Sequence, residues 1–167
     1  MHPRLAAVID AIPDPLREAR PTENAWSAAE VLEHLVRVEK GIAKLVALKV
    51  GEMQTMEQPP RESPGMVAVA VSRFTAITDR SMRIDAPERV IPDGEMSAAT
   101  ARAALLETRG ILLDQLHAGD GLAYSSVAHQ HPIFGVLDLY EWVFFIGAHE
   151  RRHTAQVREI AAHFAAA

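Results

Sequence analysis

Two histidines near the C-terminal end of the chain, His149 and His153, have the spacing of a metal-binding pair. On an α-helix, residues four apart lie one above the other on the same face. Two imidazoles placed in this way can bind one divalent metal ion. Together with Glu150, the pair also matches His-Glu-x-x-His, the pattern of zinc peptidases in which the glutamate acts as general base. The spacing therefore leaves a choice between a peptidase and another kind of metal site.

The residues that follow the pair argue against a peptidase. Extended forms of the pattern place a glycine three residues, and a third histidine six residues, after the second histidine. This chain has Gln156 and Glu159 at those positions. No strand is evident upstream that could align a peptide substrate. Glu150 stays a candidate catalytic residue, with an ion pair on the polar face of the helix as its alternative.

His34 is the candidate third ligand, because a catalytic metal site typically has three protein ligands. It lies between Val31 and Val38 on the apolar side of a predicted helix, so it can face a pair on another helix. Its alternative is a histidine at the edge of the core, bonded to a carboxylate. Gln156, three residues past His153, is a candidate for holding a ligand or a metal-bound water, or else an ordinary polar residue.

The other histidines have weaker claims. His129 and His131 fall in a region that we expect to be a loop, residues 119–135, and they could approach the metal site. A role in a turn is equally open for His131, because Pro132 follows it. The remaining histidines lie near chain or helix ends and are not expected as ligands: His2, His117 and His163.

Helices must position these residues. Four segments show helical periodicity, and they cover residues 4–20, 27–51, 97–117 and 138 to the C-terminal end. The first is interrupted by Pro13 and Pro15. The second and fourth start with the spacing of a capping box, at Ser27 with Glu30 and at Asp138 with Glu141.

The connections complete the predicted fold. A shorter helix is expected over residues 66–84, inside a long crossover of residues 52–96, and no segment has a convincing strand pattern. We therefore predict an all-α fold, an antiparallel four-helix bundle with an extra short helix in the crossover. One domain is expected over residues 1–167.

Composition restricts the class of protein. The chain has 167 residues with 49% hydrophobic and 23% charged residues, which is typical of a globular domain. Its net charge of −5 predicts no broad basic surface for nucleic acid. No apolar run is long enough for a membrane span and no signal peptide is evident, so we expect a cytoplasmic protein. With no cysteine, a metal must be bound by His, Asp or Glu.

Several motifs, in this order, resemble the DinB-like superfamily, and specifically its YfiT-like branch of metal-dependent hydrolases. The resemblance covers most of the chain. The motifs that carry it are Trp26-Ser-Ala-Ala-Glu-Val-Leu-Glu-His34, Ala86-Pro87-Glu88 with Pro92, His131-Pro-x-x-Gly135, Glu141-Trp142 and His149-Glu-Arg-Arg-His153-Thr-Ala-Gln156.

The resemblance implies a four-helix bundle of up-down-down-up topology and a metal ion, often nickel or zinc, bound by His34, His149 and His153. Some relatives transfer low-molecular-weight thiols such as bacillithiol or mycothiol, others are isomerases that use such thiols, and homodimers are common. We therefore expect a hydrolase or thiol S-transferase that acts on a small molecule. A non-catalytic, stress-associated metal-binding bundle is the alternative.

Overall fold

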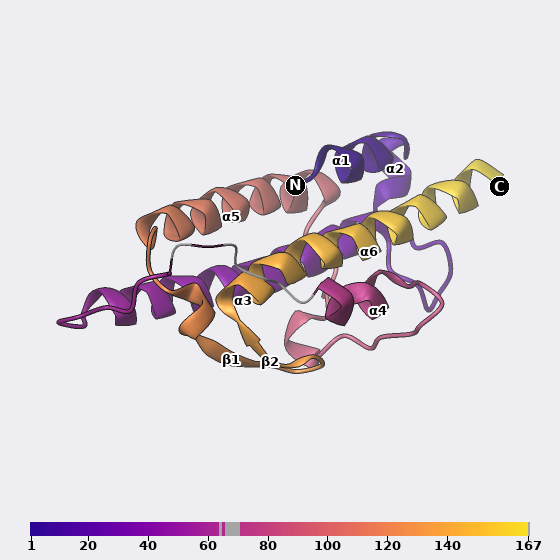
Figure 1. Ribbon diagram of the computed structural model, residues 1–167. Coiled ribbons are helices and arrows are strands. Elements are labelled where there is room, and N and C mark those ends of the chain that lie inside the picture. The colour runs from indigo at the N-terminus through magenta and orange to yellow at the C-terminus, as the bar shows by residue number, and fades with distance from the viewer. Residues whose placement is uncertain (64, 66–70, 167) are drawn as a thin grey trace.

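The computed structural model describes residues 1–63, 65 and 71–166, and most of these are helical. Three long helices dominate them: α3 (Ala28–Gln54), α5 (Ala98–Ala118) and α6 (Leu139–Ala166). Helix α5 packs along α3, and α6 runs across α3 in front of it (Figure 1). No helix of the described residues is both long and apolar enough to cross a membrane.

Helices α3 and α6 begin where the sequence predicts. The Ser27 hydroxyl accepts a hydrogen bond from the Glu30 amide at 3.1 Å, and the Glu30 carboxylate accepts one from the Ser27 amide at 2.8 Å. Asp138 and Glu141 exchange the equivalent bonds, at 2.8 and 3.1 Å. Both pairs satisfy amides that a helix start leaves without partners. Glu30 therefore has the capping role, and its carboxylate also pairs with Arg20.

The N-terminal segment is not a fourth long helix. It consists of α1 (Pro3–Asp10), which packs against α6, and the short α2 (Asp14–Arg17). Pro13 stands just before α2, so the predicted interruption is confirmed. The described residues thus confirm a mainly helical fold, but they do not confirm a four-helix bundle, because only three of their helices are long.

Of the predicted helix over residues 66–84, the described part, residues 71–84, contains only short helical turns. Residues 66–70 lie outside the described residues. After them come the 3-10 turn η1 (Val71–Phe74) and α4 (Thr75–Thr78). The helix stops at Asp79, which is extended and whose carboxylate accepts bonds from the Ser81 amide and hydroxyl at 2.9 and 2.7 Å. Such local side-chain bonds compete with helical ones. A second 3-10 turn, η2 (Glu88–Val90), precedes α5.

A β-hairpin corrects the prediction of an all-α fold with a loop at residues 119–135. Strands β1 (Ala128–His131) and β2 (Gly135–Asp138) pair antiparallel, with His131 opposite Gly135, and they follow the turn η3 (Tyr124–Ser126). Gly135 has φ +73°, the left-handed conformation that closes three-residue hairpin loops. The hairpin lies directly before α6, below α3 in Figure 1.

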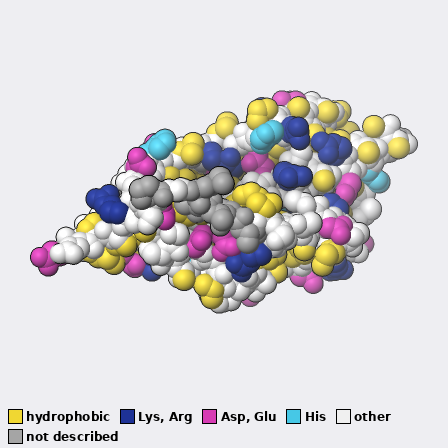
Figure 2. Space-filling model, in the orientation of Figure 1, with side chains coloured by type: hydrophobic (Ala, Val, Ile, Leu, Met, Phe, Trp, Pro, Cys, Tyr) yellow, Lys and Arg dark blue, Asp and Glu magenta, His cyan; other side chains and the backbone are white. Residues whose placement is uncertain are grey.

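Two hydrophobic clusters form the core, and the histidine pair of α6 lies between them. One cluster contains Phe145 and Ile146 and packs the hairpin side of α6 against the second half of α3. The other contains Val157 and Ile160 and packs the end of α6 against α1, α5 and the start of α3. The surface carries mixed charges, with basic and acidic side chains interspersed on the face in Figure 2.

Candidate metal centre

The three predicted ligands, His34 of α3 with His149 and His153 of α6, come together in one buried cluster. The Nε2 atom of His149 lies 3.2 Å from Nε2 of His34 and 3.1 Å from Nε2 of His153. One nitrogen from each ring lies within 4.8 Å of the others. All three side chains are buried. The structure therefore brings together two residues that are four apart in the sequence and one from more than a hundred residues upstream.

Hydrogen bonds at the outer nitrogens orient two of the rings. The Nδ1 atom of His34 lies 2.8 Å from the carbonyl oxygen of Val90, and Nδ1 of His153 lies 2.8 Å from Oε1 of Gln156. Because both partners are oxygen acceptors, each Nδ1 carries the hydrogen and each Nε2 has a free lone pair. Histidine ligands of metals commonly have such partners. Gln156 therefore bonds to one of the predicted ligands, as a supporting role would require.

The geometry fits a bound cation. Tetrahedral bonds of about 2.05 Å from a zinc ion place neighbouring ligand nitrogens about 3.3 Å apart. The observed separations of 3.1 and 3.2 Å are close to this value. Without a cation, the lone pairs of His34 and His153 both point at His149, which has only one hydrogen to share when its ring is neutral. A metal ion would satisfy all three nitrogens.

Burial keeps these imidazoles in the neutral form that binds metals. Loss of hydration lowers the pKa of His153 to about 3 and the pKa of His149 well below its usual value. The pKa of His34 is lowered for the same reason, against an opposing effect of its bond to Val90. A charge on one ring would also repel a charge on the next. At neutral pH all three nitrogens are therefore available as ligands.

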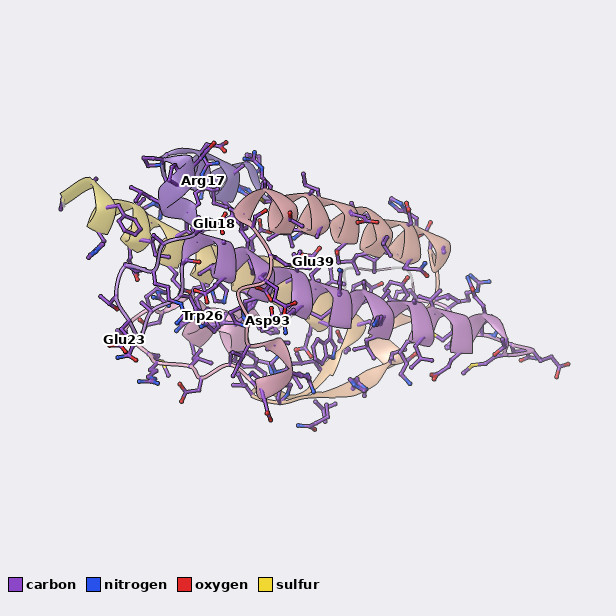
Figure 3. The ribbon with its side chains drawn as sticks, turned by 180° about the vertical axis from the view of Figure 1, so that it is seen from behind. Arg17, Glu18, Glu23, Trp26, Glu39 and Asp93 are labelled. Carbon is purple, nitrogen blue, oxygen red and sulfur yellow. The ribbon has the colours of Figure 1, made fainter. Side chains whose placement is uncertain are left out.

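The cluster opens into a cavity of about 920 Å³. The crossover, the hairpin, α3 and α6 enclose this space, and the side chains of Trp26, Trp142 and Phe145 form its apolar walls. Trp26 lies at the start of α3, on the side of the helix that faces the crossover (Figure 3). A cavity of this size can hold a small organic molecule beside the histidines.

His131 lines the cavity without joining the cluster. Its Nδ1 accepts hydrogen bonds from the amides of Ile133 and Phe134 at 3.1 and 3.2 Å, which gives it the role in a turn. Its ring packs against Trp142 and Phe145. Burial, aided by the charge of Arg89, lowers its pKa to about 4. Because Nδ1 is an acceptor, Nε2 carries the hydrogen. His129 also lines the cavity, but its side chain is exposed.

Glu150 is turned away from the cavity. Its carboxylate accepts hydrogen bonds from Arg109 of α5 at 2.9 Å and from the His2 amide at 2.5 Å. It is not among the residues that line the cavity. The structure thus places Glu150 in the ion pair that the sequence left open as its alternative, and gives no geometric support to a role as general base.

Sequence reasoning missed the residues that hold the crossover against the metal centre. Glu33, fully buried beside His34, accepts hydrogen bonds from the amides of Asp93 and Gly94 at 3.2 and 3.1 Å. Arg37 bridges Glu33 and Asp93. These bonds fix the chain just after Val90, whose carbonyl orients His34. A backbone ligand leaves no mark in the sequence, and Glu33 lay off the apolar stripe that marks buried positions.

Known proteins resemble this chain along most of its length. The model of the DinB superfamily matches residues 1–157. An uncharacterized protein of Bacillus subtilis (strain 168), YuaE, is 26% identical over 150 residues, which cover 84% of this chain and 80% of YuaE. No solved structure matches the chain significantly.

Proposed function

Because this chain belongs to the DinB superfamily, we propose that it is a metal-dependent enzyme with a three-histidine site. The observation that carries the proposal is the convergence of three Nε2 atoms, from His34, His149 and His153, at the wall of a large cavity. A bound divalent ion, zinc or nickel, would supply the acidity that turns water or a thiol into a nucleophile near neutral pH. Three protein ligands leave room for such a molecule.

The protein's own residues prepare this site. Val90 and Gln156 hold the rings of His34 and His153, so the cluster needs little rearrangement to bind an ion. Trp26 and Trp142 offer flat apolar surfaces to the organic part of a substrate. The Nε2–H group of His131 is a donor on the hairpin wall. Together these groups can bind and orient a small molecule.

A hydrolase and a thiol S-transferase would activate their nucleophile in the same way. The two are therefore distinguished by their products, one formed from water and the other from a thiol. The metal-loaded protein would be incubated with an activated aryl halide or an ester, with and without bacillithiol. Formation of the thioether only when bacillithiol is present supports thiol transfer. Turnover without thiol, lost on chelation, supports hydrolysis. If neither kind of metal-dependent turnover is detected, the non-catalytic metal-binding bundle is favoured.

The metal site itself is tested by metal analysis. Protein purified without a histidine tag would be loaded with zinc or nickel, dialysed and analysed by mass spectrometry. We expect one equivalent in the wild type, and a loss of most of it in His34→Ala. The matched control is His163→Ala, which removes an exposed histidine from the same helix as the ligand pair. Unchanged metal content in His34→Ala would show that the three-histidine site is wrong.

A further inference from the structure

The lining of the cavity beside the histidines contains more basic than acidic side chains, although the chain as a whole has a net charge of −5. One acidic side chain, Asp85, is among its lining residues. The basic residues of the lining are five arginines: Arg37, Arg80, Arg83, Arg89 and Arg152. Concentrating one sign of charge in a cleft with apolar walls raises the local concentration of oppositely charged ligands.

Carboxylates compensate some of these arginines. Arg37 is bridged to Glu33 and Asp93, and Arg80 pairs with Glu159 at 2.8 Å. The charges of Arg37 and Arg80 are therefore largely neutralised by these carboxylates.

The pair Arg83–Asp85, at 3.0 Å, is different because both side chains are more than four-fifths exposed. An ion pair in water is worth little, so Arg83 can turn to another anion at small cost.

Arg89 and Arg152 have no carboxylate partner among the described residues. Arg152 is buried, and its guanidinium donates instead to carbonyl oxygens of the crossover, those of Ile77, Asp79 and Met82, at 2.6 to 3.1 Å. Arg89 is exposed on η2. Among the five lining arginines, Arg89 is thus the one whose guanidinium makes no hydrogen bond to another described residue.

Arg89 is also tied to the metal centre. It is adjacent to Val90, whose carbonyl oxygen orients His34, so η2 both positions a ligand and presents this arginine. The hairpin residue His131 lines the same cavity, and the charge of Arg89 contributes, after burial, to lowering its pKa. Arg89 therefore faces the same space as the three histidines.

We propose that Arg89, assisted by Arg83, forms a subsite that binds a carboxylate or phosphate group of the substrate. The guanidinium fork matches both groups with two parallel hydrogen bonds. The apolar part of the substrate would lie against Trp26 and Trp142, which brings its reacting atom to the histidine cluster. This inference rests on the proposed function, because it treats the cavity as a substrate site.

The two tryptophans of the chain allow a direct test, because both line the cavity. Intrinsic fluorescence and calorimetry would follow binding of succinate, inorganic phosphate and the neutral analogue succinamide to the full chain, with zinc and after chelation. We expect saturable binding of an anion but not of succinamide, weakened by added salt. A preference for phosphate or for succinate would tell a phosphorylated substrate from a carboxylic acid.

Variants assign the binding to Arg89. Arg89→Gln should weaken anion binding about tenfold, whereas Arg89→Lys should retain part of it. The control is Arg158→Gln, the same charge change at an exposed position of α6 that does not line the cavity. The subsite would be overturned by any of three results. These are equal anion affinity in Arg89→Gln and wild type, binding of succinamide as tight as that of succinate, or no anion binding up to roughly 10 mM.

Metal analysis of the same samples separates the two proposals. Arginine-dependent anion binding by a protein that takes up no metal would keep the subsite and refute the metal-dependent enzyme. A full equivalent of zinc, together with anion binding that is unchanged in Arg89→Gln, would refute the subsite and keep the metal site, since the anion is then bound by the ion alone.

Discussion

Gln156 is a single residue on which the metal affinity should depend. Its Oε1 accepts the Nδ1 hydrogen of His153 at 2.8 Å, which fixes the tautomer and the direction of that ligand. Gln156→Leu keeps a similar volume but removes the acceptor, so we expect metal affinity to fall by about 10- to 100-fold. Competition with a chromophoric chelator measures this. Gln156→Glu keeps an acceptor and should bind nearly as the wild type does. Unchanged affinity in Gln156→Leu would contradict the supporting role.

His131 makes the stability of the metal-free protein depend on pH. Its Nδ1 can accept the two turn amides only when the ring is neutral, and burial lowers its pKa to about 4. In the unfolded chain a histidine titrates near about 6.5. Between these values the unfolded chain binds a proton that the native His131 does not. The contribution of His131 is therefore complete above about pH 6.5 and is lost as the pH falls toward 4.

His131→Asn should flatten this dependence, because asparagine can accept the turn amides but does not titrate. Urea unfolding of the metal-free proteins, followed by circular dichroism between about pH 7 and 4.5, gives the free energy of unfolding. We expect the wild type to lose more stability than the variant, by at most about 1.4 kcal/mol per pH unit. His34, His149 and His153 are present in both proteins, so the difference isolates His131. Parallel curves would show that the native His131 is not held neutral.

The site was predictable from sequence where its residues follow helical spacing. His149 and His153 share a helix face by geometry alone, and His34 stands on an apolar stripe. The direction of Glu150 was not predictable, because it depends on Arg109 of α5, which no local pattern links to it. The same holds for Arg89, whose place at the cavity depends on how the crossover folds back onto α3.

At the scale of elements, local chemistry decided which predictions held. The capping boxes at Ser27 and Asp138 are local signals, and both helix starts are confirmed. The hairpin was missed because its strands have four residues each and no apolar alternation. Its signal was the turn, where Pro132 is followed by Gly135 with a positive φ. Short strands are thus better indicated by their turns than by their own composition.

Arg152 should control the order of the crossover. Its buried guanidinium donates to the carbonyls of Ile77, Asp79 and Met82, a segment that otherwise lacks helical bonds after α4. Arg152→Met leaves these oxygens without their charged donor, so we expect a loss of about 1–3 kcal/mol and easier local opening. Limited trypsin digestion should then cleave faster after Arg80 and Arg83.

The control for Arg152 is its neighbour Arg151, which is exposed. Arg151→Met removes the same charge and should leave the cleavage rate and the stability within about 0.5 kcal/mol of the wild type. Equal protection of Arg80 and Arg83 in the two variants would show that the crossover is held by other contacts.

At the scale of the whole molecule, an ionic network joins the helices behind the metal centre. Arg109 of α5 donates to Glu39 of α3 and to Glu150 of α6, and Glu150 also accepts the His2 amide before α1. Glu39 lies between α3 and α5 in Figure 3. The pKa of Arg109 is raised by its hydrogen bond to Glu39 and then by Glu150. Because Glu150 is adjacent to His149, this network fixes the helix that carries the ligand pair.

Removing only the positive charge of Arg109 should therefore destabilise the fold more than removing all the charges of the network. Arg109→Met leaves Glu39 and Glu150 buried without their partner, at a cost of about 3 kcal/mol, the lower end for such pairs because Arg109 is 26% exposed. The triple variant Glu39→Gln, Arg109→Met, Glu150→Gln should recover most of this loss. Chemical denaturation at pH 7 measures both. A single variant as stable as the triple would show that burying Glu39 and Glu150 without Arg109 carries no extra penalty.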